Sequence, residues 1–387
     1  MPVSIDERLW PPLKGADESR PSDDAAKSSM AALVARVVGA KPFPETARRL
    51  ADMTRMPQAR ISNAVRILET DPGLSARLLR LVNSPGYALR MRCTSLRHAA
   101  ALVGLERLNH ISTTAAVLDM FGDNTEVSAQ ILDHSTIVGA FCRYFAVSFS
   151  LPAEELFTCG FLHDIGKLFL LEAEGDAYAA LLSQSSADSH ERERELYGFD
   201  HASLGAHVLH AWNIPDPVPL VVAWHHSRSL FEGPPEISAM IETLRLSDEI
   251  AELMGTLSDG RAIRRIAESQ AAQRLNLGEQ QLTEIWPELR TLRSHCRAQR
   301  NNDQTKFVDV TSIRPSASLP PPSVPPPKSS PRPEQVCGIC SEPGPSSTCS
   351  ACDDNVCAKH LHAPDGWCDR CLADFATTRG ALGIGLP

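Results

Sequence analysis

The chain has 387 residues, of which 43% are hydrophobic and 22% charged, and this is enough for two or more domains with a substantial core. The formal net charge is −9 at pH 7 and no long basic run occurs, so charge gives no general case for nucleic-acid binding. No apolar stretch has the length of a membrane span, and residues 1–26 lack the apolar core of a signal peptide. These features predict a cytoplasmic protein without a membrane or nucleic-acid partner.

Residues 1–32 combine charged residues with proline and serine, and we expect them to be disordered. Residues 33–300 have apolar residues at helical spacing together with helix-capping signals. Asp71 followed by Pro72, for example, is typical of a helix N-terminus. Few segments alternate as strands do, so this region is predicted to be all-α.

Predicted helices in this region turn polar side chains toward their apolar face. His134 is in phase with Ile131 and Val138, and Asp248 is in phase with Leu244. A carboxylate on a core-facing stripe is costly unless it is paired or binds a metal. The full set of nitrogen and oxygen donors is His134, His163, Asp164, His201, His225, His226 and Asp248. Such donors suit one or two divalent ions of iron, manganese or zinc, and the alternative is a metal-free, hydrogen-bonded polar cluster.

Several motifs of this region resemble the HDOD domain, a bacterial signalling module related to the HD-domain metal phosphohydrolases. The resemblance covers about residues 33–240 and implies an all-helical domain, which residues 241–300 extend. The motifs that carry it are PFPETARRLADM (42–53), ILETDPGLSARLLRLVNSPGYAL (67–89), SLRHAAALVGLERLNHISTTAAVL (95–118), GFLHDIGKLFLL (160–171), HASLGAHVLHAWNIPDPV (201–218) and AWHH (223–226).

The related phosphohydrolases imply a role for each donor. By resemblance, the ligands of a first metal are His134, His163, Asp164 and Asp248. The histidines that match a second site, found in two-metal members with a GYP signature, are His201, His225 and His226. Lys167 of the HDIGK motif would lie near a phosphate, and Lys167 and Asp164 would act in catalysis if the domain is an enzyme.

The chain also departs from the GYP enzymes. After the histidine pair it reads HHSRSLFEGPPEIS (225–238), without the Glu-Arg, Asp-Gly and Gly-Tyr-Pro run that shapes the cyclic-dinucleotide site in those enzymes. HDOD domains are generally regarded as regulatory, so the resemblance implies a signal-transduction output or adaptor protein with protein partners. Two alternatives stay open, namely a metal-dependent phosphohydrolase of a nucleotide or cyclic dinucleotide, and a sensor that binds a nucleotide without cleaving it.

Residues 301–334 are proline-rich and are predicted to be a disordered linker. Seven of the eleven cysteines follow between Cys337 and Cys371, which in a reducing compartment indicates metal binding. The remaining four are expected to be ordinary buried thiols, and they are Cys93, Cys142, Cys159 and Cys296.

Residues 335–376 are predicted to be a small zinc module, followed by a tail at 377–387. Four short pairs of ligands can close two tetrahedral structural sites in a cross-brace. The predicted ligands of one zinc are Cys337, Cys340, Cys357 and His360, with His362 as an alternative to His360. Those of the other zinc are Cys349, Cys352, Cys368 and Cys371. The segment resembles B-box, RING-like and FYVE-like modules, which implies that it docks a partner protein.

Overall fold

A computed structural model of the chain divides into two units, Met1–Pro325 and Pro326–Pro387. We call the first the helical unit. Its described residues are 5–12, 22–54, 56, 59–82, 93–121, 125–184, 189–227, 229–302 and 319, and those of the second unit are 346–348, 355–357, 361–362 and 367–368.

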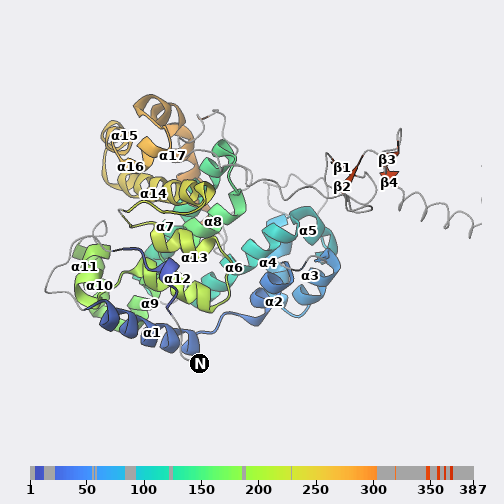
Figure 1. Ribbon diagram of the computed structural model, residues 1–387, viewed down its shortest axis with the longest axis horizontal. Coiled ribbons are helices and arrows are strands. Elements are labelled where there is room, and N and C mark those ends of the chain that lie inside the picture. The colour runs from blue at the N-terminus through green and yellow to red at the C-terminus, as the bar shows by residue number, and fades with distance from the viewer. Residues whose placement is uncertain are drawn as a thin grey trace, which may run out of the picture. The chain divides into compact units, whose positions relative to one another are not determined.

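All regular elements described in the helical unit are helices, as predicted (Figure 1). None of the described helices combines the length and the apolar character that a membrane span requires. The elements are a 3-10 helix η1 (Glu7–Leu9) and the α-helices α1 (Asp23–Ala40), α2 (Glu45–Thr54), α3 (Ile61–Leu68), α4 (Pro72–Val82), α5 (Leu96–Val103), α6 (Leu105–Phe121), α7 (Glu126–Phe149), α8 (Ala153–Leu162), α9 (Ile165–Glu174), α10 (Asp176–Gln184), α11 (Ser189–Tyr197), α12 (His201–Ala211), α13 (Val218–Trp224), α14 (Pro235–Thr256), α15 (Asp259–Ala267), α16 (Gln270–Arg274) and α17 (Glu279–Asn302).

The capping signals act as the sequence predicts. The side chain of Asp71 accepts a hydrogen bond from the backbone N–H of Leu74 at 3.0 Å, so it caps α4 just before Pro72. Helix α5 begins after Ser95, whose hydroxyl accepts from His98 N, and ends at a glycine with positive φ. These local signals fix the helix boundaries in the first half of the domain.

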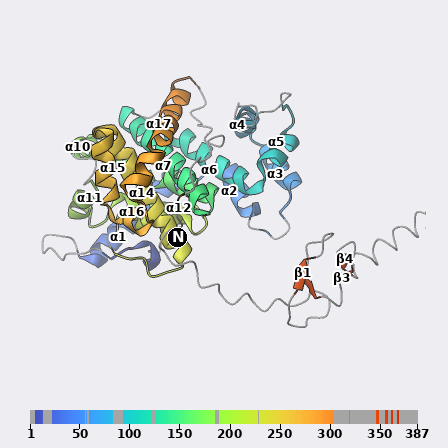
Figure 2. The ribbon, with the colours of Figure 1, turned by 90° about the horizontal axis from the view of Figure 1, so that it is seen from above.

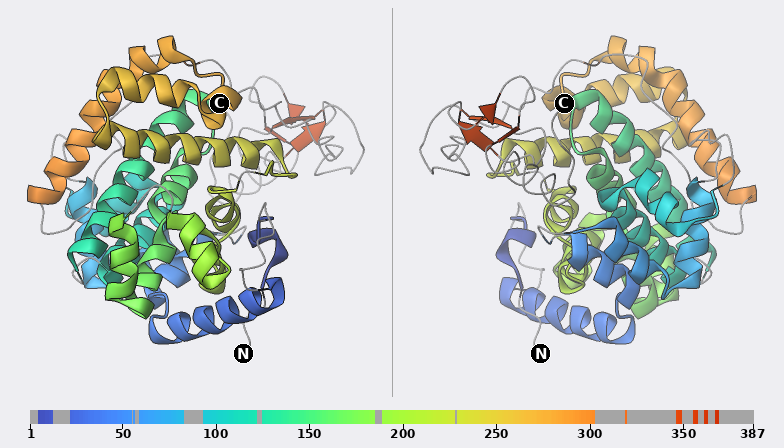
Figure 3. Two further views of the ribbon diagram at one scale, coloured as in Figure 1. Left: turned by 90° about the vertical axis from the view of Figure 1, so that its left-hand side faces the viewer. Right: turned by 90° about the vertical axis from the view of Figure 1, so that its right-hand side faces the viewer.

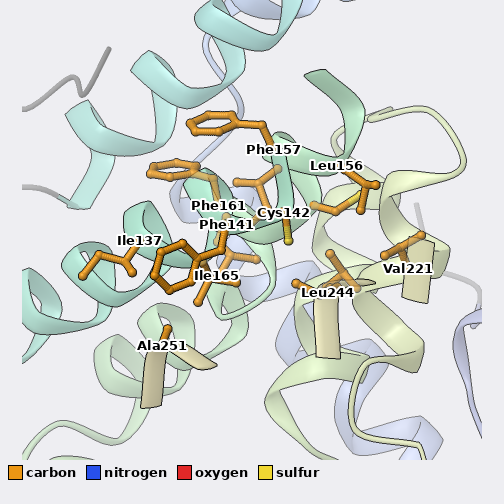
Figure 4. Close-up of a cluster of buried hydrophobic side chains, with 14 of the residues drawn as sticks. Ile137, Phe141, Cys142, Leu156, Phe157, Phe161, Ile165, Val221, Leu244 and Ala251 are labelled. Carbon is orange, nitrogen blue, oxygen red and sulfur yellow. The ribbon is translucent and has the colours of Figure 1, made fainter. Parts of the chain in front are cut away.

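The helical unit has two hydrophobic cores. The smaller core is formed by α2 to α6, which gather on one side of the unit in Figure 2. The larger core joins α1 and η1 with α6 to α17, and α14 lies across it against α7, α8 and α13 (Figure 3). Phe141, Phe157 and Phe161 meet in this larger core between α7 and α8, with Leu244 of α14 nearby (Figure 4).

Two close helix contacts in the larger core require glycine. A Cβ atom at Gly160 would lie 2.7 Å from the Cα atom of Gly139, so α7 and α8 approach each other here without side chains between them. A Cβ atom at Gly166 would lie 2.0 Å from the carbonyl oxygen of His201. Gly166 therefore allows the first turn of α9 to lie directly against the start of α12.

The disorder expected for residues 1–32 is wrong for the part that the structure describes. Residues 5–12 include η1, and α1 begins at Asp23. Leu9 and Met30 are fully buried, and the indole N–H of Trp224 donates to the carbonyl oxygen of Arg8 at 2.8 Å. The prediction relied on the polar composition and overlooked an apolar stripe. Met30, Val34 and Val37 share one face of α1, and this face is buried. Residues 1–4 and 13–21 lie outside the described residues.

The four scattered cysteines are buried, as expected. In the second unit, β1 (Ser346–Thr348) pairs with β2 (Asn355–Cys357), and β3 (Leu361–His362) pairs with β4 (Trp367–Cys368), both antiparallel. Cys357 and Cys368 thus each end a strand. Of the other predicted zinc ligands, only the alternative ligand His362, in β3, is among the described residues. The linker lies outside them apart from residues 301, 302 and 319, so both zinc sites stay predictions.

Candidate metal centre

The structure brings all seven predicted donors of the helical unit together from five places in the fold. His134 is on α7, His163 and Asp164 form the turn between α8 and α9, and His201 begins α12. His225 and His226 follow α13, and Asp248 is on α14. Their donor atoms form two groups within 4.8 Å, and we call all seven the polar cluster: Asp164, His201, His225 and His226 in one group, and His134, His163 and Asp248 in the other.

Asp164 lies between the two groups. Its Oδ2 atom is 3.3 Å from His163 Nε2 and 4.0 Å from His134 Nε2. Its Oδ1 atom is 3.1 Å from His201 Nε2. One carboxylate oxygen thus faces each group, so Asp164 would be the residue common to both groups if each held an ion.

The remaining short contacts close each group. His134 Nε2 is hydrogen-bonded to Asp248 Oδ1 at 2.8 Å, and His163 Nε2 is 3.6 Å from the same oxygen. On the other side, the Nε2 atoms of His201 and His226 lie 3.1 Å apart. One nitrogen atom from the start of α12 and one from the turn after α13 therefore lie side by side.

Hydrogen bonds outside the cluster fix the orientation of its buried histidines. His163 donates from Nδ1 to Gly160 O at 2.7 Å, and His225 donates from Nδ1 to Val222 O at 2.6 Å. Among the described residues, His225 Nε2 makes no hydrogen bond, and His163 Nε2 and Asp164 Oδ1 make only the ion-pair contacts given above. A buried polar atom without a partner costs about 1–3 kcal/mol, and a metal ion would provide the missing partner. The residues present fit a divalent metal centre on this ground.

The pKa values of the cluster follow from burial and its opposing charges. Burial acts to lower the pKa of His163, but Asp164 and Asp248 outweigh it and raise this pKa to about 10. Burial acts to raise the pKa of Asp164, but the charges of His163 and Lys167 hold it well below its usual range. Burial, followed by repulsion from His163, lowers the pKa of His225 to about 3. A metal ion would displace the proton of His163, so metal affinity should increase with pH.

A cavity of about 310 Å³ opens onto the polar cluster. Lys167 lines it, and its Nζ is 2.8 Å from Asp164 Oδ2. The cavity reaches His134, Asp164, His226 and Asp248, and its walls combine apolar with polar side chains, namely Val127, Ile131, Ala179 and Leu182 with Gln130, Ser183 and Glu252. A small ligand of mixed polarity can therefore reach the predicted metal ligands and Lys167 together.

Three further residues beside the cluster were not predicted from the sequence, namely Tyr178, His190 and Glu193. Glu193 is fully buried, and its carboxylate accepts from His201 Nδ1 at 2.7 Å and from the hydroxyl of Tyr178 at 2.7 Å. The ring of His190 is stacked on that of His226, with centroids 4.2 Å apart. Glu193 was missed because it lies in the charged run SHERERELY, whose composition is typical of an exposed helix.

Comparisons with known proteins agree with the fold. A solved HDOD domain protein of unknown function from Geobacter sulfurreducens has a TM-score of 0.56 at 19% identity, covering 69% of this chain and 96% of that one. A Marinobacter aquaeolei VT8 protein, provisionally named a signal transduction protein, has a TM-score of 0.55 at 19% identity, covering 77% and 67%. A Shewanella amazonensis SB2B protein, provisionally named a phosphohydrolase, has a TM-score of 0.54 at 21% identity, covering 68% and 97%.

The sequence comparisons point to the same domain. An uncharacterized protein of Treponema pallidum (strain Nichols) is 23% identical over 214 residues, which are 53% of this chain. The match covers 41% of that protein, so the chain spans less than half of its length. The family model for the HDOD domain matches residues 41–228, which include every predicted metal ligand of the helical unit except Asp248. Residues 41–228 of this chain are therefore an HDOD domain, as its motifs predicted.

Proposed function

We propose that this chain is a cytoplasmic signal-transduction output protein whose helical unit holds two divalent metal ions in the polar cluster. One observation carries the metal assignment. Among the described residues, His225 Nε2 is buried without a hydrogen bond, and the buried atoms His163 Nε2 and Asp164 Oδ1 make only ion-pair contacts within the polar cluster. The residues that would hold one ion are His134, His163, Asp164 and Asp248, and those that would hold the other are Asp164, His201, His225 and His226.

The metals would serve a signalling role by joining distant parts of the helical unit. The ligands come from α7, α12 and α14 and from the ends of α8 and α13, so bound ions would fix these elements against one another. Ligand entry through the cavity could then change the surface that a partner protein contacts. The HDOD assignment and the name of the Marinobacter neighbour support signalling, and the absent GYP run speaks against a cyclic-dinucleotide enzyme. The predicted zinc module would dock a second protein.

Metal content of the full chain tests this proposal. Elemental analysis of purified wild-type protein should find two ions more than in Asp164→Asn, because Asp164 would contact both. The matched control is Asp176→Asn, an exposed aspartate on α10 that should leave metal content unchanged. Equal metal content in all three proteins, with helical content preserved in circular dichroism, would remove the metal centre from the proposal.

Hydrolysis of a phosphate ester is the second candidate, and the cavity favours it. The cavity brings Lys167 and the predicted ligands Asp164 and Asp248 to one accessible surface, so a phosphate could meet all of them. Bound metals would polarise a phosphoryl oxygen and supply hydroxide near neutral pH. The volume of the cavity, about 310 Å³, is at the lower end of the range for small-molecule sites. This size favours a mononucleotide over a cyclic dinucleotide as the substrate.

A metal-replete preparation separates the two candidates. Turnover of nucleotides or cyclic dinucleotides that is lost in Asp248→Asn would establish hydrolysis. A nucleotide that raises the melting temperature without being consumed would instead indicate ligand sensing. No turnover and no thermal shift across the panel would leave protein contacts as the function of the helical unit.

A further inference from the structure

Helix α11 has an unusual position for a helix of its composition. It reads SHERERELY, with six charged or histidine side chains in nine residues, yet Glu193 in its middle is fully buried. A buried carboxylate is tolerated only when it is well hydrogen-bonded. Glu193 meets this condition with three donors, namely the Tyr178 hydroxyl at 2.7 Å, the His201 backbone N–H at 2.6 Å and His201 Nδ1 at 2.7 Å.

Two of these three bonds act on the same histidine. Glu193 Oε2 accepts from both the backbone N–H and the ring Nδ1 of His201, which fixes the ring relative to its own backbone. With Nδ1 engaged, the Nε2 atom is directed at Asp164 Oδ1, 3.1 Å away. A carboxylate bound to the outer nitrogen of a histidine also makes the inner nitrogen a stronger metal ligand.

The same helix supports the neighbouring ligand and the start of α12. The ring of His190 is nearly parallel to that of His226, with 3° between their planes, so it restricts rotation of that ring. Arg194 donates from Nε to Asp200 Oδ2 at 2.8 Å, and Asp200 Oδ1 accepts from Ser203 N at 2.8 Å to cap α12. Contacts from α11 thus reach two adjacent ligands and the helix that carries one of them.

We infer that α11 positions two ligands of the group formed by Asp164, His201, His225 and His226. Glu193 orients the ring of His201, and His190 supports the ring of His226. The inference rests on the proposed metal centre. Glu193 and His190 are positioning residues here, since each acts through the histidine that it contacts.

The first test measures Mn²⁺ binding to the full chain by electron paramagnetic resonance. Mn²⁺ suits nitrogen and oxygen donors and disfavours thiolates, so the cysteine-rich tail should not interfere. Glu193→Gln should weaken one Mn²⁺ site by about 10- to 100-fold, the usual effect of losing such an outer partner. The matched control is Glu195→Gln, which makes the same chemical change at an exposed position of α11 and should leave both affinities unchanged.

The second test needs no metal. In metal-free protein, the Nδ1 proton of His201 should give a strongly downfield resonance, identified by its absence in His201→Gln. That resonance should persist in Glu195→Gln and move upfield or exchange away in Glu193→Gln. Tyr178→Phe removes one hydrogen bond from Glu193 without changing its charge, so it should give a smaller shift and a smaller loss of affinity.

The outcomes separate this inference from the proposed function. Mn²⁺ binding that is equal in wild type and Glu193→Gln, with an unchanged His201 resonance, overturns the role of α11 alone. Failure of wild type to bind any divalent ion refutes the metal centre, while the His201 resonance still decides whether Glu193 orients the ring. If Glu193→Gln does not fold, the Tyr178→Phe protein decides by the same two measurements.

Discussion

The two hydrophobic cores of the helical unit differ in the polar groups that they enclose. Among its described residues, the smaller core is accompanied by buried hydroxyl groups, such as Ser75, which donates to Leu68 O at 2.7 Å, and Ser112, which donates to Leu108 O at 2.7 Å. The larger core surrounds buried ionisable side chains, namely His163, Asp164, Glu193, Asp200, His201, His207, His225 and Glu242.

This difference indicates that the smaller core serves as a scaffold and that the larger core holds the candidate site. A hydroxyl needs one nearby carbonyl oxygen, which lies in the same helix for Ser112 and in the preceding helix α3 for Ser75, and it costs little to bury. A buried charge instead needs several partners from other elements. In the larger core those partners come from α7, α11, α12 and α14, so the arrangement of the helices depends on the cluster. The smaller core depends on apolar packing and on short hydroxyl bonds such as that of Ser75, and changes there should affect stability without affecting the metal centre.

Removal of the shared carboxylate should have the largest effect. Asp164→Ala removes the carboxylate paired with Lys167 and the nearer of the two carboxylates beside His163, and loss of one partner of a buried ion pair costs about 3–5 kcal/mol. Urea unfolding of metal-free protein measures the change. Asp176→Ala, at an exposed site, should stay within about 0.5 kcal/mol of wild type. A comparable loss for both variants would mean that the cluster is not an interdependent charge network.

A cavity in the smaller core should destabilise the protein somewhat less and spare the metal centre. Leu78 is fully buried on α4, and Leu78→Ala should cost about 2–4 kcal/mol through lost packing. Elemental analysis of the folded fraction should give the wild-type metal content. A parallel loss of metal would show that the two cores are coupled and would break the distinction drawn between them.

Acidification should weaken the contact between α6 and α8. Burial lowers the pKa of His110 to about 4, and its Nδ1 is 2.6 Å from the hydroxyl of Thr158 on α8. The unfolded chain takes up this proton below about pH 6.5 and the folded protein only near pH 4, so stability should fall as pH drops between these values. We expect roughly 2 kcal/mol from this group, with allowance for partial exposure.

Melting temperatures from pH 7.5 to pH 4 test this group against a variant that cannot titrate. His110→Asn should be less stable than wild type at pH 7.5, and its stability should fall less steeply below pH 6.5. Parallel profiles for the two proteins would assign the acid sensitivity to other groups.

Loss of a single hydroxyl in the smaller core should have the smallest effect. Ser112→Ala removes a hydrogen bond to Leu108 O within α6 and should cost about 1 kcal/mol or less. Urea unfolding gives the value. A loss above about 3 kcal/mol would show that this hydroxyl has a role beyond its own helix.

The sequence by itself determined the helical class, the HDOD motifs and the donors of the polar cluster. These depend on local signals, since capping residues and apolar periodicity show where a helix begins and which face is buried. His134 and Asp248 were recognised as inward-facing for this reason. Their hydrogen bond joins residues 114 positions apart. The inward-facing donors suggested a shared polar site, and the resemblance to a family assigned the two residues to the same metal.

The tertiary structure decided which groups share the site. From composition, Glu193 is expected to be exposed like the charged residues around it, and residues 5–12 are expected to be disordered. Both are in fact packed against the larger core. The physical reason is the same in the two cases. Burial of a polar segment depends on hydrogen-bond partners elsewhere in the chain. Glu193 has His201 and Tyr178 as partners, and the backbone of Arg8 has Trp224. The periodicity of the sequence does not show which distant residues will be partners.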